Sequence, residues 1–379
     1  MGQKGTSIRP VAKTFRIGLF VPLYLDSAFD ASLNYRYPPK TFPKFHLPGL
    51  EFYEGALLAI DTLGCEKVPV QLIVKDTRSA RQTLTEQLNS ADCKELDLIL
   101  AYCSANEIKT FAEAGIMRGI PVINVNSPND GGVVENPYLV LLNSTLRTQC
   151  LSIYAHIREK YAKQPVVVFR KKGVLEDRIQ SYMDEAGKSM GKNASKFIYV
   201  DLPDSFTVNQ LIPKLDTLKP TLCLAGSLDE NFGRRLALQL ATLSKRNYKS
   251  TLVGMPTWDV IRDFAKPDYR GIDIVYCTPF YSPRTDSVSL YITNFFNEKI
   301  YARPSDMVLR GYEAVWHFSK LLQQYGSDIA SHLSSHEYEV FREMNIQPQF
   351  GPDTKSLDYF ENKKLYFLKW QDGILKRVP

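Results

Sequence analysis

Small polar residues follow an apolar run at residues 98–106, where the sequence is LILAYCSAN. An amphipathic pattern begins directly afterwards and predicts a helix from Ser104 to about Met117. The first backbone N–H groups of a helix have no partner within it. Together with the Ser104 hydroxyl they can hold a carboxylate, but they cannot cleave it. These residues therefore predict binding, although Ser104 could equally be a simple helix N-cap.

No spaced catalytic motif supports an enzyme. The sequence lacks G-x-G-x-x-G, G-x-x-x-x-G-K-[ST], G-x-S-x-G and H-E-x-x-H, and its five histidines indicate no nucleophile–base pair. The six cysteines form no C-x-x-C pair and no Cys/His cluster with zinc spacing, so we expect no metal and no cofactor. They are typical of small buried hydrophobes, and one or two disulfides stay open if the protein is exported. These cysteines are Cys65, Cys93, Cys103, Cys150, Cys223 and Cys277.

Two charged groups are further candidates for a binding site. Asp229 and Glu230 stand at a predicted helix start, where carboxylates either cap the helix or contact a ligand. Arg170, Lys171 and Lys172 form either a solvated basic turn or a contact for an acidic ligand. This cluster is too short for a nucleic-acid face, so no nucleic-acid partner is expected.

Length and composition indicate a two-lobed globular protein. The chain has 379 residues, of which 44% are hydrophobic and 23% charged, and its net charge is +6. This length exceeds one comfortable hydrophobic core. No apolar stretch approaches the roughly 20 residues of a membrane span. The N-terminus lacks the apolar region of a signal peptide, so either the protein stays in the cytoplasm or an export signal has been removed.

The elements that would position these residues alternate along the whole chain. Short β-branched runs, such as FRIGLFVPL, are followed by helical patterns, such as GLEFYEGALLAIDTLG. This order predicts an α/β protein with two doubly wound, Rossmann-like lobes. Three chain crossings, near 142–146, 277–282 and 335–345, would join the lobes. Lobe 1 would comprise 13–143 and 280–338, lobe 2 would comprise 144–279 and 339–379, and residues 1–12 would form a tail.

Two segments depart from the alternation. Residues 26–49, rich in proline and aromatic residues, predict a long ordered loop after the first strand. Such loops are often functional, and a plain surface covering is the other interpretation. The C-terminal segment KKLYFLKWQDGILKRVP predicts a β-hairpin around Gln371-Asp372-Gly373.

The order of these segments resembles a known family from about Phe15 to Tyr325. The segments are RIGLFVPL, GLEFYEGALLAID, LILAYCSANEIKTFAEAGIMRGIPVINVNSP, NPYLVLLNSTLRTQ, TLCLAGSLDENFGRRLALQLATL and SDMVLRGYEAVWHFSKLLQQYG. They are similar to the leucine/isoleucine/valine-type solute-binding proteins of ABC transporters, which have the type I periplasmic-binding fold. The resemblance implies a periplasmic or cell-envelope receptor that closes two lobes around an amino-acid-like ligand or another carboxylate. Its partner would be an ABC transporter permease or a cell-envelope component.

The resemblance also implies site residues. In that family the loop after the third strand binds the ligand's carboxylate, and the next loop lies beside it. Lobe 1 would contribute Tyr24, Cys103, Ser104, Ala105, Asn126 and Ser127, and lobe 2 would contribute Arg170, Asp229, Thr257 and Trp258.

This chain departs from the family at several of these positions. Val174 replaces an aromatic residue, and Pro256-Thr257-Trp258 replaces the loop whose acid binds the ligand's ammonium group. The family's partner for Cys103 is missing, so we expect a free thiol there. These departures leave the ligand class open.

The opening PLYLDSAF…PGLEFYEG also resembles a branch of this fold found in chains with LysM peptidoglycan-binding modules. That resemblance implies an alternative function. The chain would be an envelope sensor or an interaction domain of a peptidoglycan-associated lipoprotein, with no role in transport.

Overall fold

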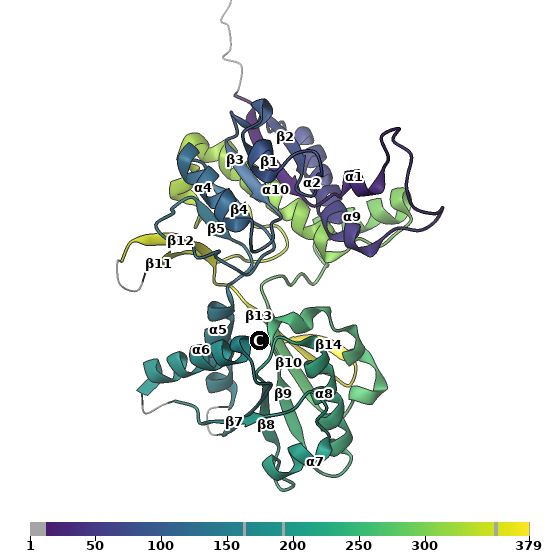
Figure 1. Ribbon diagram of the computed structural model, residues 1–379, viewed down its shortest axis with the longest axis vertical. Helices are drawn as coiled ribbons and strands as arrows, with labels where there is room; N and C mark the ends of the chain where they lie inside the picture. The colour runs from purple at the N-terminus through teal and green to yellow at the C-terminus, as the bar shows by residue number, and fades with distance from the viewer. Residues whose placement is uncertain (1–12, 162–163, 192–193, 352–354, 379) are drawn as a thin grey trace, which may run out of the picture. The chain divides into compact units, whose positions relative to one another are not determined.

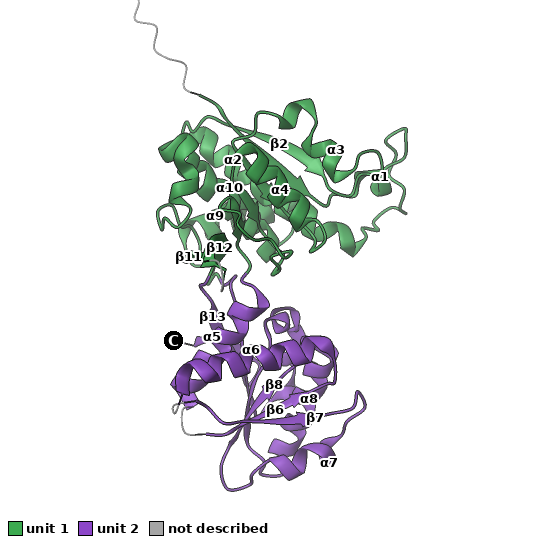
Figure 2. Cartoon of the chain, turned by 60° about the vertical axis from the view of Figure 1, so that its left-hand side comes forward, with its two compact units in different colours: residues 1–143, 282–362 green, residues 144–281, 363–379 purple. Residues whose placement is uncertain are grey.

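The computed structural model describes residues 13–161, 164–191, 194–351 and 355–378, and the expected tail, residues 1–12, lies outside them. The chain folds into two compact units (Figure 2). Unit 1 contains the chain up to Asn143 together with Ser282–Asn362, and unit 2 contains Ser144–Tyr281 together with Lys363–Pro379. The chain therefore passes from one unit to the other three times.

The third passage between the units lies further along the chain than expected, after Asn362. Residues 339–362 were assigned to the second lobe, but β11 (Ile346–Phe350) and β12 (Leu357–Asn362) belong to unit 1. The reason is a parallel ladder between β12 and β5 (Leu139–Leu141), whose backbone hydrogen bonds connect segments more than 200 residues apart. Pro348 lies within β11, which is an edge strand, and a proline weakens the sequence signal for a strand.

Unit 1 is built on a seven-stranded sheet in the order β11-β12-β5-β4-β3-β1-β2. Neighbouring strands are parallel, except for β11 with β12. The remaining strands are β1 (Phe15–Val21), β2 (Val70–Asp76), β3 (Leu98–Ala101) and β4 (Val122–Asn124). The central strands are rich in valine, leucine and isoleucine because both faces of a parallel sheet are covered.

Unit 2 has a second seven-stranded sheet, in the order β14-β13-β10-β9-β8-β6-β7. Pairing is parallel from β10 to β7, and antiparallel from β10 through β13 to β14. Its strands are β6 (Val166–Arg170), β7 (Phe197–Asp201), β8 (Thr221–Ala225), β9 (Ser250–Val253), β10 (Asp273–Thr278), β13 (Tyr366–Gln371) and β14 (Ile374–Val378). The predicted C-terminal hairpin is confirmed, and Asp372 and Gly373 supply the two positive φ angles of its turn.

The two sheets share one topology. In each unit the first five strands have the spatial order second, first, third, fourth, fifth. This arrangement confirms the predicted α/β class with two doubly wound sheets.

Helices cover both faces of the sheet in unit 1 (Figure 1). Side chains alternate along β1, so that Ile17 and Leu19 join the core beneath α2 and α10, whereas Phe20 packs against Phe111 of α4. The helices of this unit are α1 (Leu25–Ala28), α2 (Leu47–Cys65), α3 (Leu84–Leu88), α4 (Ile108–Arg118), α9 (Ser287–Phe295) and α10 (Asp306–Tyr325). Shorter helical turns are η1 (Lys44–His46), η2 (Ala91–Cys93), η8 (Phe296–Ile300) and η9 (Gly326–His332).

Two glycines allow α2 and α10 to touch backbone to backbone. A Cβ atom on Gly55 would lie 1.9 Å from the carbonyl oxygen of Val308, and one on Gly311 would lie 2.0 Å from that of Phe52. Moving a side chain cannot relieve these clashes, because the backbone fixes both the Cβ position and the carbonyl oxygen. The contact of these two helices therefore depends on glycine at both positions.

Unit 2 also has a core on each face of its sheet. Val166 and Val168 of β6 pack toward α5 and α6, and Val167 and Phe169 pack toward α8. The helices are α5 (Leu146–Tyr161), α6 (Val174–Met190), α7 (Val208–Leu211) and α8 (Glu230–Ser244). Shorter turns are η4 (Ile212–Lys214), η5 (Pro256–Val260), η6 (Arg262–Ala265) and η7 (Pro267–Tyr269).

The segment TRSARQTLTEQLNSA, residues 77–91, has a helical pattern, but the helix found there is much shorter. The helix α3 begins after Thr83, whose hydroxyl and backbone N–H form a capping box with Glu86. Residues before Thr83 instead form turns that follow β2. Within the described residues, no helix is both long and apolar enough to cross a membrane.

Acid is expected to destabilise unit 1 through His317. This residue is fully buried in α10, and burial lowers the pKa of its imidazole from 6.5 to about 4. Its Nδ1 donates to the carbonyl oxygen of Tyr338 at 2.9 Å. The unfolded chain binds a proton at His317 near pH 6.5, whereas the folded protein does not. The contribution of His317 to the free energy of unfolding is therefore fully present above pH 6.5. Roughly 3 kcal/mol of it is lost as the pH falls toward 4.

Urea unfolding of the wild type and His317→Gln at several pH values tests this contribution. The wild type should be the more stable protein at pH 7, and its advantage should shrink steadily below pH 6.5. Parallel stability curves for the two proteins would show that His317 does not titrate between the folded and unfolded states.

Candidate functional site

The topology marks one edge of each sheet as the candidate site. Ligands of doubly wound sheets bind beyond the carboxyl ends of the strands, where the strand order reverses. In unit 1 this point lies between β1 and β3, and in unit 2 it lies between β6 and β8. The loops there are 22–24 and 102–107 in unit 1, and 171–173 and 226–229 in unit 2.

Ser104 does not begin the following helix. The helix α4 starts at Ile108, and residues 105–107 form a turn. The N–H and the hydroxyl of Ser104 both donate to Oε2 of Glu107, each at 2.7 Å. Glu107 in turn accepts two bonds from the Arg78 guanidinium, at 2.8 and 3.1 Å. The donors expected to hold a ligand's carboxylate are therefore bonded to a carboxylate of the chain itself.

Cys103 is a buried, free thiol. Burial, together with the nearby negative charge of Glu107, raises the pKa of its thiol to about 12, so the thiol stays protonated near neutral pH. Its N–H donates to Oδ1 of Asn126 at 2.9 Å. All six cysteines are free, and all except Cys65 are buried.

Asn126 and Ser127 lie beside Cys103 because β3 and β4 are neighbours. The buried Asn124 fixes their loop, since its side chain bonds to both the N–H and the carbonyl of Ser127 at 2.9 Å. Asn143 adds a bond to the carbonyl of Asn126 at 2.7 Å. Ser127 is itself buried, whereas Ala105 is exposed at the tip of the neighbouring loop.

Tyr24 adopts a left-handed backbone conformation directly after β1, with φ 56°. The carboxylate of Asp76, at the end of β2, holds this turn by accepting from the N–H groups of Leu23, Tyr24 and Leu25 at 2.8–3.1 Å. The same carboxylate accepts the Arg78 N–H at 2.9 Å. Asp76 was not identified from the sequence, although an aspartate at the end of a strand is a common signal for such a turn.

Tyr102 brings further polar groups to the carboxyl end of β3. Its ring packs edge-on against Phe52 at 5.7 Å. Burial raises the pKa of its hydroxyl, while the positive charge of Arg310 lowers it and the negative charge of Glu51 raises it. Glu51 also accepts from the hydroxyl of Ser305, the N-cap of α10, at 2.8 Å. The members of this group lie on three distant segments, so no local sequence pattern indicates them.

In unit 2, Arg170 and Lys171 of the basic cluster are paired with acids of their own unit. Arg170 forms ion pairs with Asp177 and Asp201, which raise the pKa of its guanidinium. Lys171 pairs with Asp229 at 2.8 Å and with Asp204 at 3.1 Å.

Asp229 also caps α8 by accepting the N–H groups of Asn231 and Phe232. The Lys171 ammonium and these bonds lower the pKa of its carboxyl group. Ser227 beside it donates to Glu176 at 2.6 Å. Capping, one of the two roles expected for Asp229, is therefore confirmed, and the remaining partner of its carboxylate is Lys171 of the same unit.

The two candidate ligand-binding residues that follow β9, Thr257 and Trp258, lie in different surroundings. The hydroxyl of Thr257 donates to the carbonyl of Leu228 at 3.0 Å and so joins the loops after β8 and β9. Trp258 instead lies wholly within the core of unit 2, against Phe264. Gly233 and Gly254 make room for its indole, since a Cβ atom on either would lie 2.6 or 2.0 Å from the ring. The expectation that Trp258 faces a ligand is therefore corrected.

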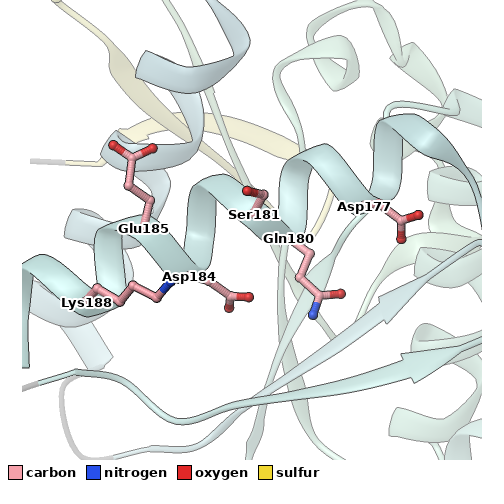
Figure 3. Close-up of a pocket in the computed structure, with 6 residues that line it drawn as sticks. All are labelled: Asp177, Gln180, Ser181, Asp184, Glu185 and Lys188. Atoms are coloured by element: carbon pink, nitrogen blue, oxygen red, sulfur yellow. The ribbon is translucent and has the colours of Figure 1, made fainter. Parts of the chain in front are cut away.

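A shallow hollow of about 530 Å³ lies along α6 (Figure 3). All six lining residues come from this one helix, namely Asp177, Gln180, Ser181, Asp184, Glu185 and Lys188. Three of its acids have partners: Asp177 pairs with Arg170, Glu185 pairs with Arg147, and Asp184 accepts from Tyr199. The hollow is thus an exposed polar helix face. No group of three or more His, Cys, Asp or Glu residues within the described chain could hold a metal ion.

Two doubly wound units and three chain passages define the type I periplasmic-binding-protein fold, and solved structures agree. No protein-family model matches the sequence, and a search of curated proteins found no match. A putative branched-chain amino acid ABC transporter from Rhodospirillum rubrum has a TM-score of 0.66 and 14% identity, over 97% of this chain and 100% of that chain.

Two other solved structures extend the comparison. An ABC transporter substrate-binding protein from Desulfitobacterium hafniense, in complex with Leu, has a TM-score of 0.60 and 12% identity, over 97% of this chain and 100% of that one. LpoA from Haemophilus influenzae has a TM-score of 0.59 and 12% identity, over 98% of this chain but only 60% of that one. The likeness establishes the fold.

Proposed function

We propose that this chain is an extracytoplasmic receptor whose two units close around a small polar ligand, either amino-acid-like or another carboxylate. The solved structures of the same fold include a substrate-binding protein in complex with Leu. The receptor would act in the periplasm or cell envelope and deliver its ligand to an ABC transporter permease. It would bind its ligand without catalysis.

The repeated topology carries this proposal. In both units the loops at the strand-order reversal present polar groups, with Ser104 and Tyr24 in unit 1 and Lys171 and Asp229 in unit 2. A ligand that bonds to both sets would favour the closed arrangement by its difference in affinity for the two states.

The internal pairing of these groups limits which ligands can bind. A carboxylate ligand must replace Glu107 at the Ser104 donors, while Arg78 keeps Glu107 in place. Binding would then exchange one charge-assisted bond for another. Affinity would come mainly from groups other than the serine.

A thermal-shift screen tests the proposed function. Branched-chain amino acids, small dicarboxylates and muropeptide fragments would be added at increasing concentration. A ligand should raise the melting temperature progressively as its concentration exceeds its dissociation constant. Chemical conversion of a stabilising compound would contradict a purely binding role.

Ser104→Ala should weaken the binding of a carboxylate ligand only about 2- to 10-fold, because the bond is exchanged and not newly made. Isothermal titration with the strongest ligand from the screen measures this change. Ser189→Ala, on α6, is the matched control, since its hydroxyl bonds to the carbonyl oxygen of Ala186 in the same helix. An unchanged affinity for Ser104→Ala would place the ligand elsewhere.

A second candidate function is an envelope sensor or interaction domain without a transport role. The observation that favours it is the internal satisfaction of the polar groups at both candidate edges, among them Ser104, Lys171 and Ser227. The likeness to LpoA is compatible with it. A flat response throughout the thermal-shift screen would favour this function over the receptor.

A further inference from the structure

The long loop predicted between the first strand and the first long helix is an ordered, projecting structure. We call residues 29–45 the aromatic loop. Figure 1 shows it as the dark purple segment after α1 that extends away from the sheet of unit 1. A short β-bridge joins Phe29 to Tyr35, and the Tyr35 hydroxyl donates to the carbonyl of Thr41 at 2.9 Å. The N–H of Arg36 donates to the carbonyl of Ala28 at 2.9 Å.

Aromatic packing fixes the base of this loop. The buried ring of His46 stacks on Phe45 at 4.3 Å, and Tyr24, Phe42 and Tyr37 surround it at 5.4, 5.5 and 6.0 Å. The exposed side chains of the loop therefore project from a fixed frame.

Several large apolar side chains of the aromatic loop are nevertheless exposed to solvent. Leu33 is 80% exposed, Phe45 50% and Phe42 45%. Leu33 also has φ 64°, a left-handed conformation that normally favours glycine or asparagine. The carboxylate of Asp30 holds this turn by accepting from the N–H groups of Ser32 and Asn34. Folding of this chain gains little from a leucine at such a position, which leaves the side chain available for an external contact.

The charges of the aromatic loop identify the partner's chemistry. Arg36, Lys40 and Lys44 are exposed, and among the described residues neither lysine forms an ion pair. The single acid of the loop, Asp30, is occupied by its own turn. The chain as a whole has a net charge of +6. The loop thus presents apolar tips flanked by cations, which match the acyl region and the anionic head groups of a lipid bilayer.

We propose that the aromatic loop docks unit 1 onto an anionic lipid bilayer, with Leu33, Phe42 and Phe45 inserted at the interface and Lys40 and Lys44 at the head groups. A projecting loop can enter a bilayer directly, whereas a protein partner would need a matching concave surface. This proposal is independent of the ligand-binding function.

Vesicle co-sedimentation tests the docking. The full chain should sediment with phosphatidylcholine vesicles that contain phosphatidylglycerol, and much less with phosphatidylcholine alone or at high salt. The triple variant Leu33→Ser/Phe42→Ser/Phe45→Ser should partition at least about 10-fold more weakly. Lys40→Glu/Lys44→Glu should lose most of the difference between the two kinds of vesicle.

Val174→Ser/Leu218→Ser is the matched control, because these side chains are 78% and 95% exposed in unit 2. It should bind vesicles like the wild type. Circular dichroism melting checks that each variant is folded. The proposal is overturned if the folded wild type stays in solution with anionic vesicles, or if the control variant weakens binding as much as the triple variant. Concentration-dependent association without lipid, lost in the triple variant, would assign the loop to contact between copies instead.

Discussion

Gly55→Ala is expected to lower the free energy of unfolding of unit 1 by about 2 kcal/mol. The new methyl group would lie 1.9 Å from the carbonyl oxygen of Val308, so α2 and α10 must separate. Overpacking of this kind typically costs about 1–3 kcal/mol, and a clash with backbone lies at the upper end. The better helix propensity of alanine offsets only about 1 kcal/mol.

Gly64→Ala provides a control within the same helix. No atom lies within 4 Å of the Cβ position at Gly64, and its backbone is not left-handed. This variant should therefore gain about 0.5–1 kcal/mol from helix propensity alone. Urea unfolding followed by circular dichroism measures both proteins. Equal effects of the two substitutions would mean that α2 and α10 do not pack as closely as the structure has them.

Arg342→Met should destabilise unit 1 by about 3 kcal/mol, because it removes the ion-pair partner of the buried Glu313 carboxylate and leaves it with the Phe341 N–H bond and the charge of Arg310. Both side chains are only 4% exposed, and Nε of Arg342 donates to Oε2 of Glu313 at 2.7 Å. Burial already raises the pKa of Glu313, and the Arg342 charge opposes this rise. Without that charge the carboxyl group should prefer its protonated form still more strongly.

Two further measurements test whether the loss of stability comes from the buried charge of Glu313. The penalty of Arg342→Met should be smaller at pH 5 than at pH 8, since protonation removes the uncompensated charge. The double variant Glu313→Leu/Arg342→Met should recover much of the lost stability, because replacing both partners avoids a buried charge. A double variant no more stable than Arg342→Met would indicate that the arginine acts through packing instead.

The local sequence pattern predicted most elements of the sheets and the long helices. The run FRIGLFVPL contains the buried strand β1, and the periodic segment GLEFYEGALLAIDTLG lies within α2. The helix start expected at Asp229 and Glu230 is the start of α8. These elements depend on side-chain periodicity and capping within a few residues, which one segment contains by itself. The position of Ser104 after β3 was predictable for the same reason, because the polar residues follow the strand directly.

The tertiary structure decided most of what those residues touch. Ser104 faces Glu107, which Arg78 holds from the loop after β2, so its donors are already bonded within the chain. Trp258 is core because Gly233 and Gly254 leave space for its ring. The sequence placed the polar residues at the ends of the correct strands, because strand order along the chain is local information. The contact between Ser104 and Glu107 spans only three residues, but Arg78 and Gly233 lie on distant segments, which only the packing of each unit brings into place.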